Sequence, residues 1–505
     1  MQIEPQATAF AKRYARGEPQ VVWCTLVSDL ETPVSAFLKI AGTRPLSFLL
    51  ESVEGGALRG RYSIIGLNPD LVWRTVGGRA EINRSAQQSA GSFAPCGRPP
   101  MTALRAVIAE SRIELPDVLP PMAAGIFGYL GYDMVRLMEE LPAPNPDPIG
   151  IPDAVLMRPT VVVVFDTVKD LITLVTPVRP ESGVSAETAF ARASERLTAI
   201  VDALDAPLAH SPPDVQAGPL TVWPSSNMTP AEYERMVNVA KEYIAAGDIF
   251  QVVLSQRFEA PFELPPFALY RALRRVNPAP FLYFLDFGGF SIVGSSPEIL
   301  VRVREGTVTI RPLAGTRPRG TTPQHDKALE TELLADEKER AEHLMLLDLG
   351  RNDVGRVARP ATVKVTDQFF IQRFSQVMHI VSNVEGQLDG KYDALDALAA
   401  GFPAGTVSGA PKVRAMEIIN ELEPDKRGLY AGSVGYFSAA GELDSCIVLR
   451  TALIKDGTMY VQAGAGIVAD SNPKSEQQEC VDKAKALFRA AEEAKRFASA
   501  ARRGS

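Results

Sequence analysis

Apolar and polar residues alternate with a period of two in several clusters along the chain. In the N-terminal part, Asn-Pro-Asp and Gly-Gly turns separate the runs RYSIIGL, LVWRTV and RAEIN, and Lys169-Asp170 separates two long apolar runs. Further along, Gly-Gly, Ser-Pro-Glu and Glu-Gly turns separate the runs FLYFLDF, FSIVGS, ILVRVR and TVTIRPLA. Period-two runs joined by short turns predict antiparallel strands. We therefore expect large antiparallel sheets rather than a doubly wound parallel sheet.

Helix start signals mark the segments between the strand clusters. Helices are expected near 101–112 and 185–204. Another begins where Thr229 can cap, Pro230 takes the first helical position and Glu232 completes a capping box. Because the helices are segregated from the strand clusters along the chain, the predicted fold class is α+β.

A proline-rich stretch at 206–228 predicts a linker between two regions. It separates an N-terminal region, 1–205, from a C-terminal region, 229–490, which is followed by a tail, 491–505. The pattern A-G-x-x-G-Y occurs once in each region, in AAGIFGYLG and in YAGSVGYFS. This shared pattern indicates that the two halves repeat one plan.

Carboxylates gather at the start of a predicted helix in the stretch DEKERAEHLMLLDLGRND. Asp336 can cap this helix and Glu339 can return the hydrogen bond, while Gly350 can end it. Glu339 and Glu342 are three residues apart and so share one helix face.

A second pair at the same spacing, Glu476 and Glu479, follows the helix start signal Asn472-Pro473. Two such faces meeting across a cleft would suit Mg²⁺, which prefers a few carboxylates with water and substrate oxygens. Spacing alone favours the plainer interpretation, a cap with two solvated helix faces.

Composition restricts the class of protein. The chain has 505 residues, of which 46% are hydrophobic and 22% charged, and its net charge of −7 argues against a nucleic-acid binder. No apolar run reaches membrane-spanning length, and the N-terminus carries no signal-peptide pattern. The four cysteines form no CxxC pair, which fits a reducing compartment. We expect a soluble cytoplasmic protein.

Three features could carry chemistry, although each has a structural alternative. His379 lies in an apolar run, where it either serves in a site or is a satisfied core histidine. Arg450 interrupts the predicted strand CIVLRTALI and could bind an anionic ligand or form an internal ion pair. Gly464-Ala465-Gly466 follows the next strand and could present N–H groups to an anion or form an ordinary turn.

Six motifs in a fixed order closely resemble the chorismate-utilising enzymes. They are GDIFQVVLSQRF, GSSPE, RPLAGTRPRG, EHLMLLDLGRND, GTVSGAPK and QAGAGIV, and this resemblance covers about 229–490. Residues 45–180 resemble the N-terminal region of the anthranilate synthase branch of that family. The resemblance implies an α/β sandwich with two large antiparallel sheets, consistent with the predicted strand clusters.

The resemblance also implies a Mg²⁺ cofactor and an assignment of site residues. Glu342 and Glu479 match the metal ligands, with Glu339 and Glu476 close by or bonding through water. Glu298 in GSSPE matches the general acid that protonates the departing C4 hydroxyl of chorismate. His379 matches the position that handles a proton when pyruvate is eliminated, and Thr406 lies beside it. The substrate-binding positions match Gly315, Thr316, Tyr430, Arg450, Gly464, Ala465 and Gly466. Of these residues, Arg450 would hold the enolpyruvyl carboxylate.

Two positions discriminate among the reactions of the family. Related isochorismate synthases place a water-activating lysine at the position of Gln251, and related aminodeoxychorismate synthases place an attacking lysine at the position of Ala314. The resemblance therefore implies attack of ammonia on C2, loss of pyruvate and formation of anthranilate. Two alternatives stay open: an enzyme that stops at aminodeoxyisochorismate, and a non-catalytic tryptophan-sensing or scaffolding paralogue.

Partners are implied by the same resemblance. The chain has no GxCxG thiol elbow, so ammonia would come from a separate glutamine amidotransferase subunit in a hetero-oligomer. Ser52 of LLES and NPAPFL, with Pro280, Phe281 and Leu282, match the site for feedback inhibition by L-tryptophan. NPAPFL stands where the family has NPSPYM, so the resemblance implies inhibition that is retained but altered.

Overall fold

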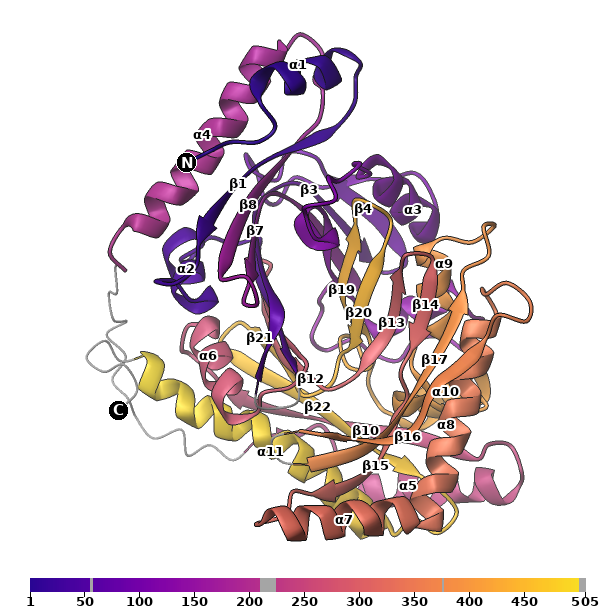
Figure 1. Cartoon of the computed structure of the whole chain (residues 1–505). Coiled ribbons are helices and arrows are strands. Elements are labelled where there is room, and N and C mark those ends of the chain that lie inside the picture. The colour runs from indigo at the N-terminus through magenta and orange to yellow at the C-terminus, as the bar shows by residue number, and fades with distance from the viewer. Residues whose placement is uncertain (55–57, 209–223, 375–376, 499–505) are drawn as a thin grey trace.

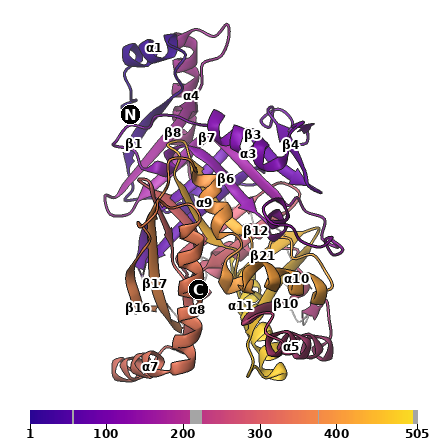
Figure 2. The ribbon, with the colours of Figure 1, turned by 90° about the vertical axis from the view of Figure 1, so that its right-hand side faces the viewer.

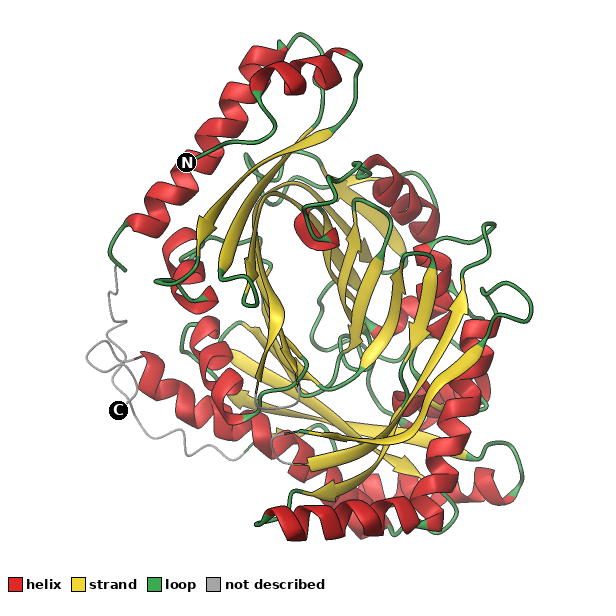
Figure 3. Ribbon diagram, in the orientation of Figure 1, coloured by secondary structure: helices red, strands yellow, loops and turns green. Residues whose placement is uncertain are grey.

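The computed structural model of the chain describes residues 1–54, 58–208, 224–374 and 377–498 (Figure 1). Most of the predicted linker and the end of the predicted tail lie outside these ranges. Strands occupy the interior, and helices lie around the outside of the sheets (Figure 3). No helix among the described residues is long and apolar enough to cross a membrane.

The strands of the N-terminal region confirm the predicted antiparallel arrangement. The region comprises β1 (Gln20–Val27), β2 (Ser47–Glu54), β3 (Leu58–Val76), β4 (Arg79–Asn83), β5 (Ala94–Pro95), β6 (Gly125–Leu130), β7 (Ala154–Asp166) and β8 (Leu171–Val178). One prediction is wrong here, because RYSIIGL and LVWRTV belong to a single strand, β3. Its Asn-Pro-Asp segment shifts the register against β7 between Pro69 and Leu71 instead of turning the chain.

The C-terminal region contributes the remaining strands, again in antiparallel pairs. They are β9 (Ser225–Ser226), β10 (Gln251–Pro261), β11 (Phe281–Asp286), β12 (Ser291–Ser296), β13 (Ile299–Arg304), β14 (Thr307–Ile310), β15 (Leu313–Pro318), β16 (Lys364–Arg373), β17 (Val377–Gln387), β18 (Gly409–Ala410), β19 (Ser433–Ser438), β20 (Leu443–Ile447), β21 (Thr451–Lys455) and β22 (Thr458–Ile467).

The two regions share their sheets. Strand β6 pairs with β19, which places Gly128 opposite Gly435. These two strands carry the repeated A-G-x-x-G-Y pattern, so the two copies lie side by side. Strand β2 pairs with β11, which places Ser52 opposite Phe281. The N-terminal and C-terminal regions predicted from the sequence are therefore joined by hydrogen-bonded strands as well as by the chain between them.

The helices comprise eleven α-helices and three short 3₁₀ turns within the described residues. They are α1 (Ala7–Ala15), α2 (Pro33–Ile40), α3 (Pro100–Glu110), α4 (Ala186–Asp205), α5 (Pro230–Ala245), α6 (Pro266–Val276), α7 (Pro323–Ala335), α8 (Glu337–Gly355), α9 (Ala394–Gly401), α10 (Lys412–Leu422) and α11 (Pro473–Ala498), with η1 (Pro121–Ala123), η2 (Tyr132–Leu137) and η3 (Gly405–Val407).

Helix starts agree with the predicted capping signals more closely than helix ends do. The capping box of Thr229 and Glu232 is present at the start of α5. Asn472 accepts hydrogen bonds from the N–H groups of Lys474 and Ser475 at the start of α11. Helix α8 is different, because it continues past Gly350 to residue 355 and packs along β15 and β17 (Figure 2). Its last turn is buried at Val354, so packing overrides the glycine stop signal.

Each of the two largest hydrophobic clusters contains residues of both regions. One joins Trp73 of β3 to Leu254 of β10 and Leu347 of α8. The other joins Phe37 of α2 to Phe267 of α6 and is completed by residues of α11. Burial of apolar surface in both clusters therefore holds the two regions together.

Candidate active site

Glu298 lies in the short connection between β12 and β13 and is only 5% exposed. Burial raises the pKa of its carboxyl to about 8, against the lowering effects of hydrogen bonds from Thr406 and the Leu313 N–H and of the Arg450 charge. The Oγ1 atom of Thr406, in η3, lies 3.1 and 3.2 Å from the two carboxyl oxygens. The carboxyl thus keeps a proton near neutral pH and can act as an acid.

Arg450 does not lie inside a strand, and this part of the sequence interpretation is wrong. The predicted strand is broken at this residue, which joins β20 to β21 with a left-handed φ of 48°. Burial lowers the pKa of Arg450, and the charge of Glu298 raises it. Because the neighbouring Glu298 carboxyl is protonated near neutral pH, the guanidinium charge is left to interact with an anionic ligand.

His379, on β17, is buried and held by the β15 backbone. Its Nδ1 atom lies 3.1 Å from the Gly315 carbonyl oxygen and 2.9 Å from Thr316 Oγ1. A carbonyl oxygen only accepts, so Nδ1 carries the hydrogen and Nε2 keeps a lone pair. Burial, then the charges of Arg450 and Lys483, lower the pKa of His379 to about 3. The ring is neutral, and Nε2 has no hydrogen-bond partner among the described residues.

Gly464, Ala465 and Gly466 lie within β22 and not in a turn after it, which corrects the prediction of an anion-binding turn. They pair with Ser255, Leu254 and Val253 of β10. Gly464 is required by close approach, because a Cβ there would lie 2.7 Å from the Leu254 carbonyl oxygen and 2.8 Å from Tyr430 Oη. A Cβ at Gly466 would lie 2.5 Å from Nε2 of the flexible Gln251 side chain, which would have to move.

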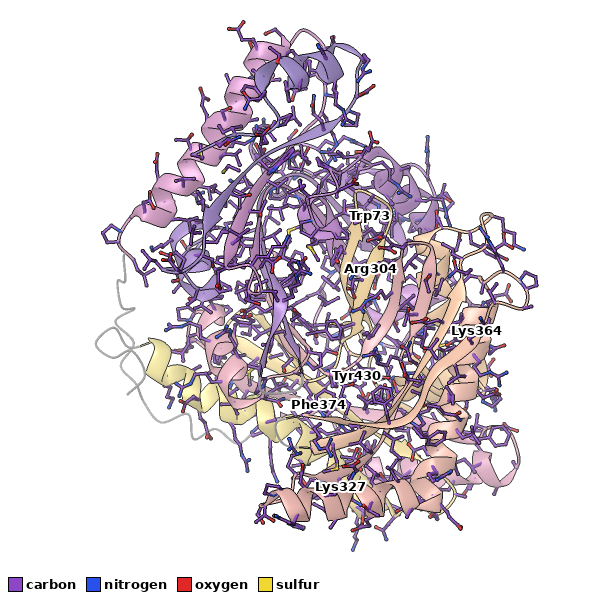
Figure 4. All side chains as sticks on the ribbon, viewed as in Figure 1. Trp73, Arg304, Lys327, Lys364, Phe374 and Tyr430 are labelled. Carbon is purple, nitrogen blue, oxygen red and sulfur yellow. The ribbon has the colours of Figure 1, made fainter. Side chains whose placement is uncertain are left out.

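Tyr430 is buried, and it lies in the lower half of the molecule in Figure 4, among elements of the C-terminal region. Strand β22 therefore acts as a flat wall against which the side chains of Tyr430 and Gln251 lie.

Carboxylates from α8 and α11 influence one another. Burial raises the pKa of Glu342, and the negative charges of Glu339 on the same helix and Glu479 on α11 raise it further. Gln251 Nε2 lies 3.5 Å from Glu342 Oε1. Burial also raises the pKa of Glu476, with Glu479 as a further cause. Glu342 and Glu476 are half-buried and Glu479 is exposed. Carboxylates that repel one another fit a hard divalent cation, which would neutralise them.

Two of these glutamates also pair with basic side chains. Asp336 caps α8 as predicted, but the capping box is absent, because the side chain of Glu339 pairs with Arg317 at 3.0 Å. Glu479 pairs with Lys483 at 2.8 Å. Over the described ranges, no three His, Cys, Asp or Glu side chains are placed so that they could hold a metal ion. The assignment of metal ligands therefore stays a prediction.

Lys483 is a site residue that the sequence interpretation missed. Its Nζ atom donates a hydrogen bond of 2.9 Å to the Gly464 carbonyl oxygen, and its charge lowers the pKa of His379. The signal that could have found it is the helical i, i+4 spacing from Glu479.

The residues matched to tryptophan inhibition come together through strand pairing. Ser52 on β2 lies opposite Phe281 on β11, and Ser52 Oγ donates to the Tyr62 carbonyl oxygen at 3.0 Å. Pro280 immediately precedes β11. Leu282 is 2% exposed and belongs to the cluster containing Phe37, whereas Phe281 packs against a different cluster. Only Phe281 therefore shares the face of Ser52.

None of the four cysteines has the character of an activated thiol. Cys24, Cys446 and Cys480 are buried and Cys96 is half-buried. Burial raises the pKa of all four, to about 11 for Cys24 and Cys480. A nucleophilic cysteine needs a lowered pKa and access to solvent, so the structure offers no thiol suited to glutamine hydrolysis among these residues.

Comparisons with known proteins agree on one family. A family model described as chorismate binding enzyme matches residues 70–489. Anthranilate synthase component 1 of Cereibacter sphaeroides is 58% identical over 503 residues, which cover 98% of this chain and 99% of that protein. The protein of the same name from Pseudomonas putida is 48% identical over 473 residues, covering 92% and 94%.

Solved structures give the same result. Anthranilate synthase component I from Streptococcus pneumoniae superimposes with a TM-score of 0.74 at 38% identity, over 92% of this chain and 98% of that one. The menaquinone-specific isochorismate synthase from Escherichia coli, at 21% identity and a TM-score of 0.69 over 96% of this chain and 100% of that one, shares the fold. The predicted α+β fold with antiparallel sheets is confirmed, and the chain belongs to the chorismate-binding enzymes, within the anthranilate synthase component I family.

Proposed function

We propose that the protein converts chorismate to anthranilate in a Mg²⁺-dependent reaction. Ammonia attacks C2 of the ring as the C4 hydroxyl leaves, and elimination of pyruvate then makes the ring aromatic. The observation that carries this proposal is Glu298, whose pKa of about 8 keeps the carboxyl protonated at neutral pH. A hydroxyl leaves readily only when it takes up a proton, and Glu298 is the buried acid that can supply one.

The substrate is a small dicarboxylate, and the site offers a separate means of holding each carboxylate. The Arg450 guanidinium would hold the enolpyruvyl carboxylate in a bidentate pair. Glu342 and Glu479, with Glu339 and Glu476 nearby, would hold the magnesium ion. Burial, and then the charge of neighbouring glutamates, raises the pKa values of Glu342 and Glu476, and such an ion would compensate that negative charge. When bound, that ion would neutralise the ring carboxylate and withdraw electrons from the ring.

The chain's own residues favour ammonia as the nucleophile. Gln251 carries an amide that cannot activate water as a base, and Ala314 carries no group that could attack the ring. His379 is neutral and keeps a lone pair on Nε2, so it is available for the proton that is transferred when pyruvate leaves. Its pKa of about 3 makes it a weak base, which would hold this proton only transiently. Tyr430, Thr316 and the flat wall of β22 would orient the ring between these groups.

Ammonia would come from a glutamine amidotransferase subunit in a hetero-oligomer. This part of the proposal is supported by the four cysteines, whose raised pKa values do not suit a nucleophile. L-tryptophan would act as feedback inhibitor at the paired strands carrying Ser52 and Phe281, which lie on one face.

The test is an assay of the purified chain with chorismate, magnesium and ammonium at alkaline pH, with and without a chelator. Anthranilate, measured by its fluorescence, and pyruvate should form in equal amounts. Neither product should form when the chelator is present. Amination without pyruvate release would identify an enzyme that stops at aminodeoxyisochorismate. Absence of any chorismate turnover at saturating ammonium would overturn the proposal.

A further inference from the structure

A buried ion pair lies behind the residues that face the proposed substrate site. The side chains of Arg427 and Glu423 are 1% and 3% exposed. The pair is bidentate: Arg427 Nε lies 2.8 Å from Glu423 Oε2, and Nη2 lies 2.6 Å from Oε1. The predicted site did not include either residue.

Arg427 connects three elements through its remaining N–H groups and its flat face. Nη1 donates to the Val407 carbonyl oxygen at 2.8 Å, and Nη2 donates to the Val253 carbonyl oxygen of β10 at 2.6 Å. The guanidinium carbon lies 5.4 Å from the ring centre of Tyr430 and 4.9 Å from that of Tyr132. One side chain thus contacts the η3 turn, the β10 backbone and two aromatic rings.

Glu423 extends the same network to β10. Its Oε1 atom accepts hydrogen bonds of 2.8 Å from both the backbone N–H and the hydroxyl of Ser255. Ser255 pairs with Gly464 in β22, the position where Tyr430 lies against the strand. Both carboxylate oxygens of Glu423 therefore accept hydrogen bonds, and Nε, Nη1 and Nη2 of Arg427 all donate to an acceptor.

The position of Arg427 matters because the residue that it holds, Val407, is adjacent to Thr406 in the η3 turn. Thr406 donates to Glu298 at 3.1 and 3.2 Å. A buried ion pair contributes little net stability, because desolvation offsets most of its Coulomb energy. Its geometric effect is larger, because a planar guanidinium holds its partners in fixed directions.

We propose that Arg427, held by Glu423, is a positioning residue that fixes the η3 turn with Thr406 against Glu298 and fixes Tyr430 against β22. This inference deepens the proposed function and rests on it for its catalytic consequence. The structural part, that Arg427 holds the η3 turn, can be tested independently of any reaction.

The catalytic consequence has a definite sign. The Thr406 hydrogen bond, the Leu313 N–H and the Arg450 charge all lower the pKa of Glu298, against burial. If the η3 turn shifts, the Thr406 bond is lost and the pKa of Glu298 rises. The alkaline limb of the pH profile then moves to higher pH, while kcat falls because the acid is no longer oriented.

The first experiment measures kcat against pH for Arg427→Lys, Thr406→Val and the double variant, at a fixed concentration of free ammonia. Lysine keeps the charge but cannot reproduce the fork. We expect a fall in kcat of about ten- to a hundredfold and an alkaline limb shifted upward by about 0.5 to 1 pH unit. The double variant should show the same limb shift as Thr406→Val alone. An unshifted limb in Arg427→Lys, or additive shifts, would overturn the proposal.

The second experiment measures amide hydrogen exchange of the full chain without substrate. In Arg427→Lys, exchange at Val407 and Ser408 should be about tenfold faster or more. The matched control is Arg158→Lys, another buried arginine, which holds Asp70 at 2.8 and 2.9 Å in the N-terminal region. It should leave the η3 amides unchanged. Unchanged η3 exchange in Arg427→Lys would refute the inference even if the chain proves inactive on chorismate, whereas inactivity alone refutes the proposed function.

Discussion

Glu298 and Glu342 both have raised pKa values, but the surroundings of the two carboxyls differ. Glu298 is buried beside Thr406 and Arg450, and everything except burial acts to lower its pKa. Glu342 is half-buried near Glu339 and Glu479; partial burial raises its pKa, and these negative charges raise it further. The surroundings of Glu298 keep a proton on its carboxyl, and this proton can be donated. The surroundings of Glu342 place several negative charges close together.

The difference shows that a raised pKa alone does not identify a role. A carboxyl whose pKa is raised by burial next to a cation is suited to acid catalysis, because the cation stabilises the carboxylate once the proton has left. A carboxyl whose pKa is raised by burial and then further by like charges is suited to binding a cation, which removes the repulsion.

Replacing the proton donor should have the largest effect. Glu298→Gln keeps the shape and the contact with Thr406 but has no acidic proton, so kcat should fall by about a thousandfold. Anthranilate fluorescence measures the rate, and thermal unfolding checks that the fold is retained. Glu263→Gln, at an exposed glutamate, is the control. A kcat within threefold of the wild type would show that Glu298 is not the acid.

Replacing Glu342 should have opposite effects on magnesium binding and on the stability of the metal-free protein. In Glu342→Gln the magnesium concentration needed for half-saturation should rise about ten- to a hundredfold, measured by calorimetry without substrate. The metal-free protein should become more stable near pH 8, because ionised Glu342 opposes folding there. This gain in stability should vanish when the pH is below the ordinary pKa of a glutamate, because Glu342 is then protonated and as neutral as the glutamine that replaces it.

Glu337→Gln is the matched control on the same helix, since Glu337 is exposed. If Glu342→Gln destabilised the metal-free protein near pH 8, the contrast drawn between the two carboxyls would be incorrect.

The pH profile should depend on Glu298 and not on the acidic helices. At a fixed concentration of free ammonia and saturating magnesium, kcat should decline above about pH 8, approaching a tenfold loss per pH unit as the acid ionises. Glu342→Gln should keep this limb under the same conditions. His379 should contribute no limb near neutral pH, because its pKa is lowered to about 3. An alkaline limb that moved in Glu342→Gln would assign this limb to the glutamates proposed to hold the metal ion.

The paired strands of β2 and β11 lie outside both carboxyl environments and should give the smallest effect. L-tryptophan should inhibit the wild type, and Phe281→Tyr should change the half-inhibitory concentration several-fold while leaving kcat unchanged. The added hydroxyl lies on the face of Ser52 and can form one hydrogen bond. Leu282→Met, on the opposite buried face, is the comparison variant. A flat response up to millimolar tryptophan would reject the inhibitor site.

Local sequence patterns were sufficient to predict most strands, several helix starts and the family. Period-two runs predicted the antiparallel strands, and the Thr229–Glu232 box predicted the start of α5, because these signals depend on residues within four positions of one another. The ordered motifs were sufficient to place the chain in its family. One of these motifs, GSSPE, contains Glu298, and the resemblance to the family also implied a role for His379. The structure shows that both side chains are buried.

Contacts between residues far apart in the sequence became known from the folded chain alone. The break at Arg450, the position of Gly464 inside β22, and the extension of α8 past Gly350 all contradict local signals. The pairing of Ser52 with Phe281 and the contact between Arg427 and the Val407 carbonyl likewise could not be predicted from local patterns. The physical reason is that strand register and buried ion pairs depend on how the whole apolar surface packs, and that packing can override the preference of a single residue.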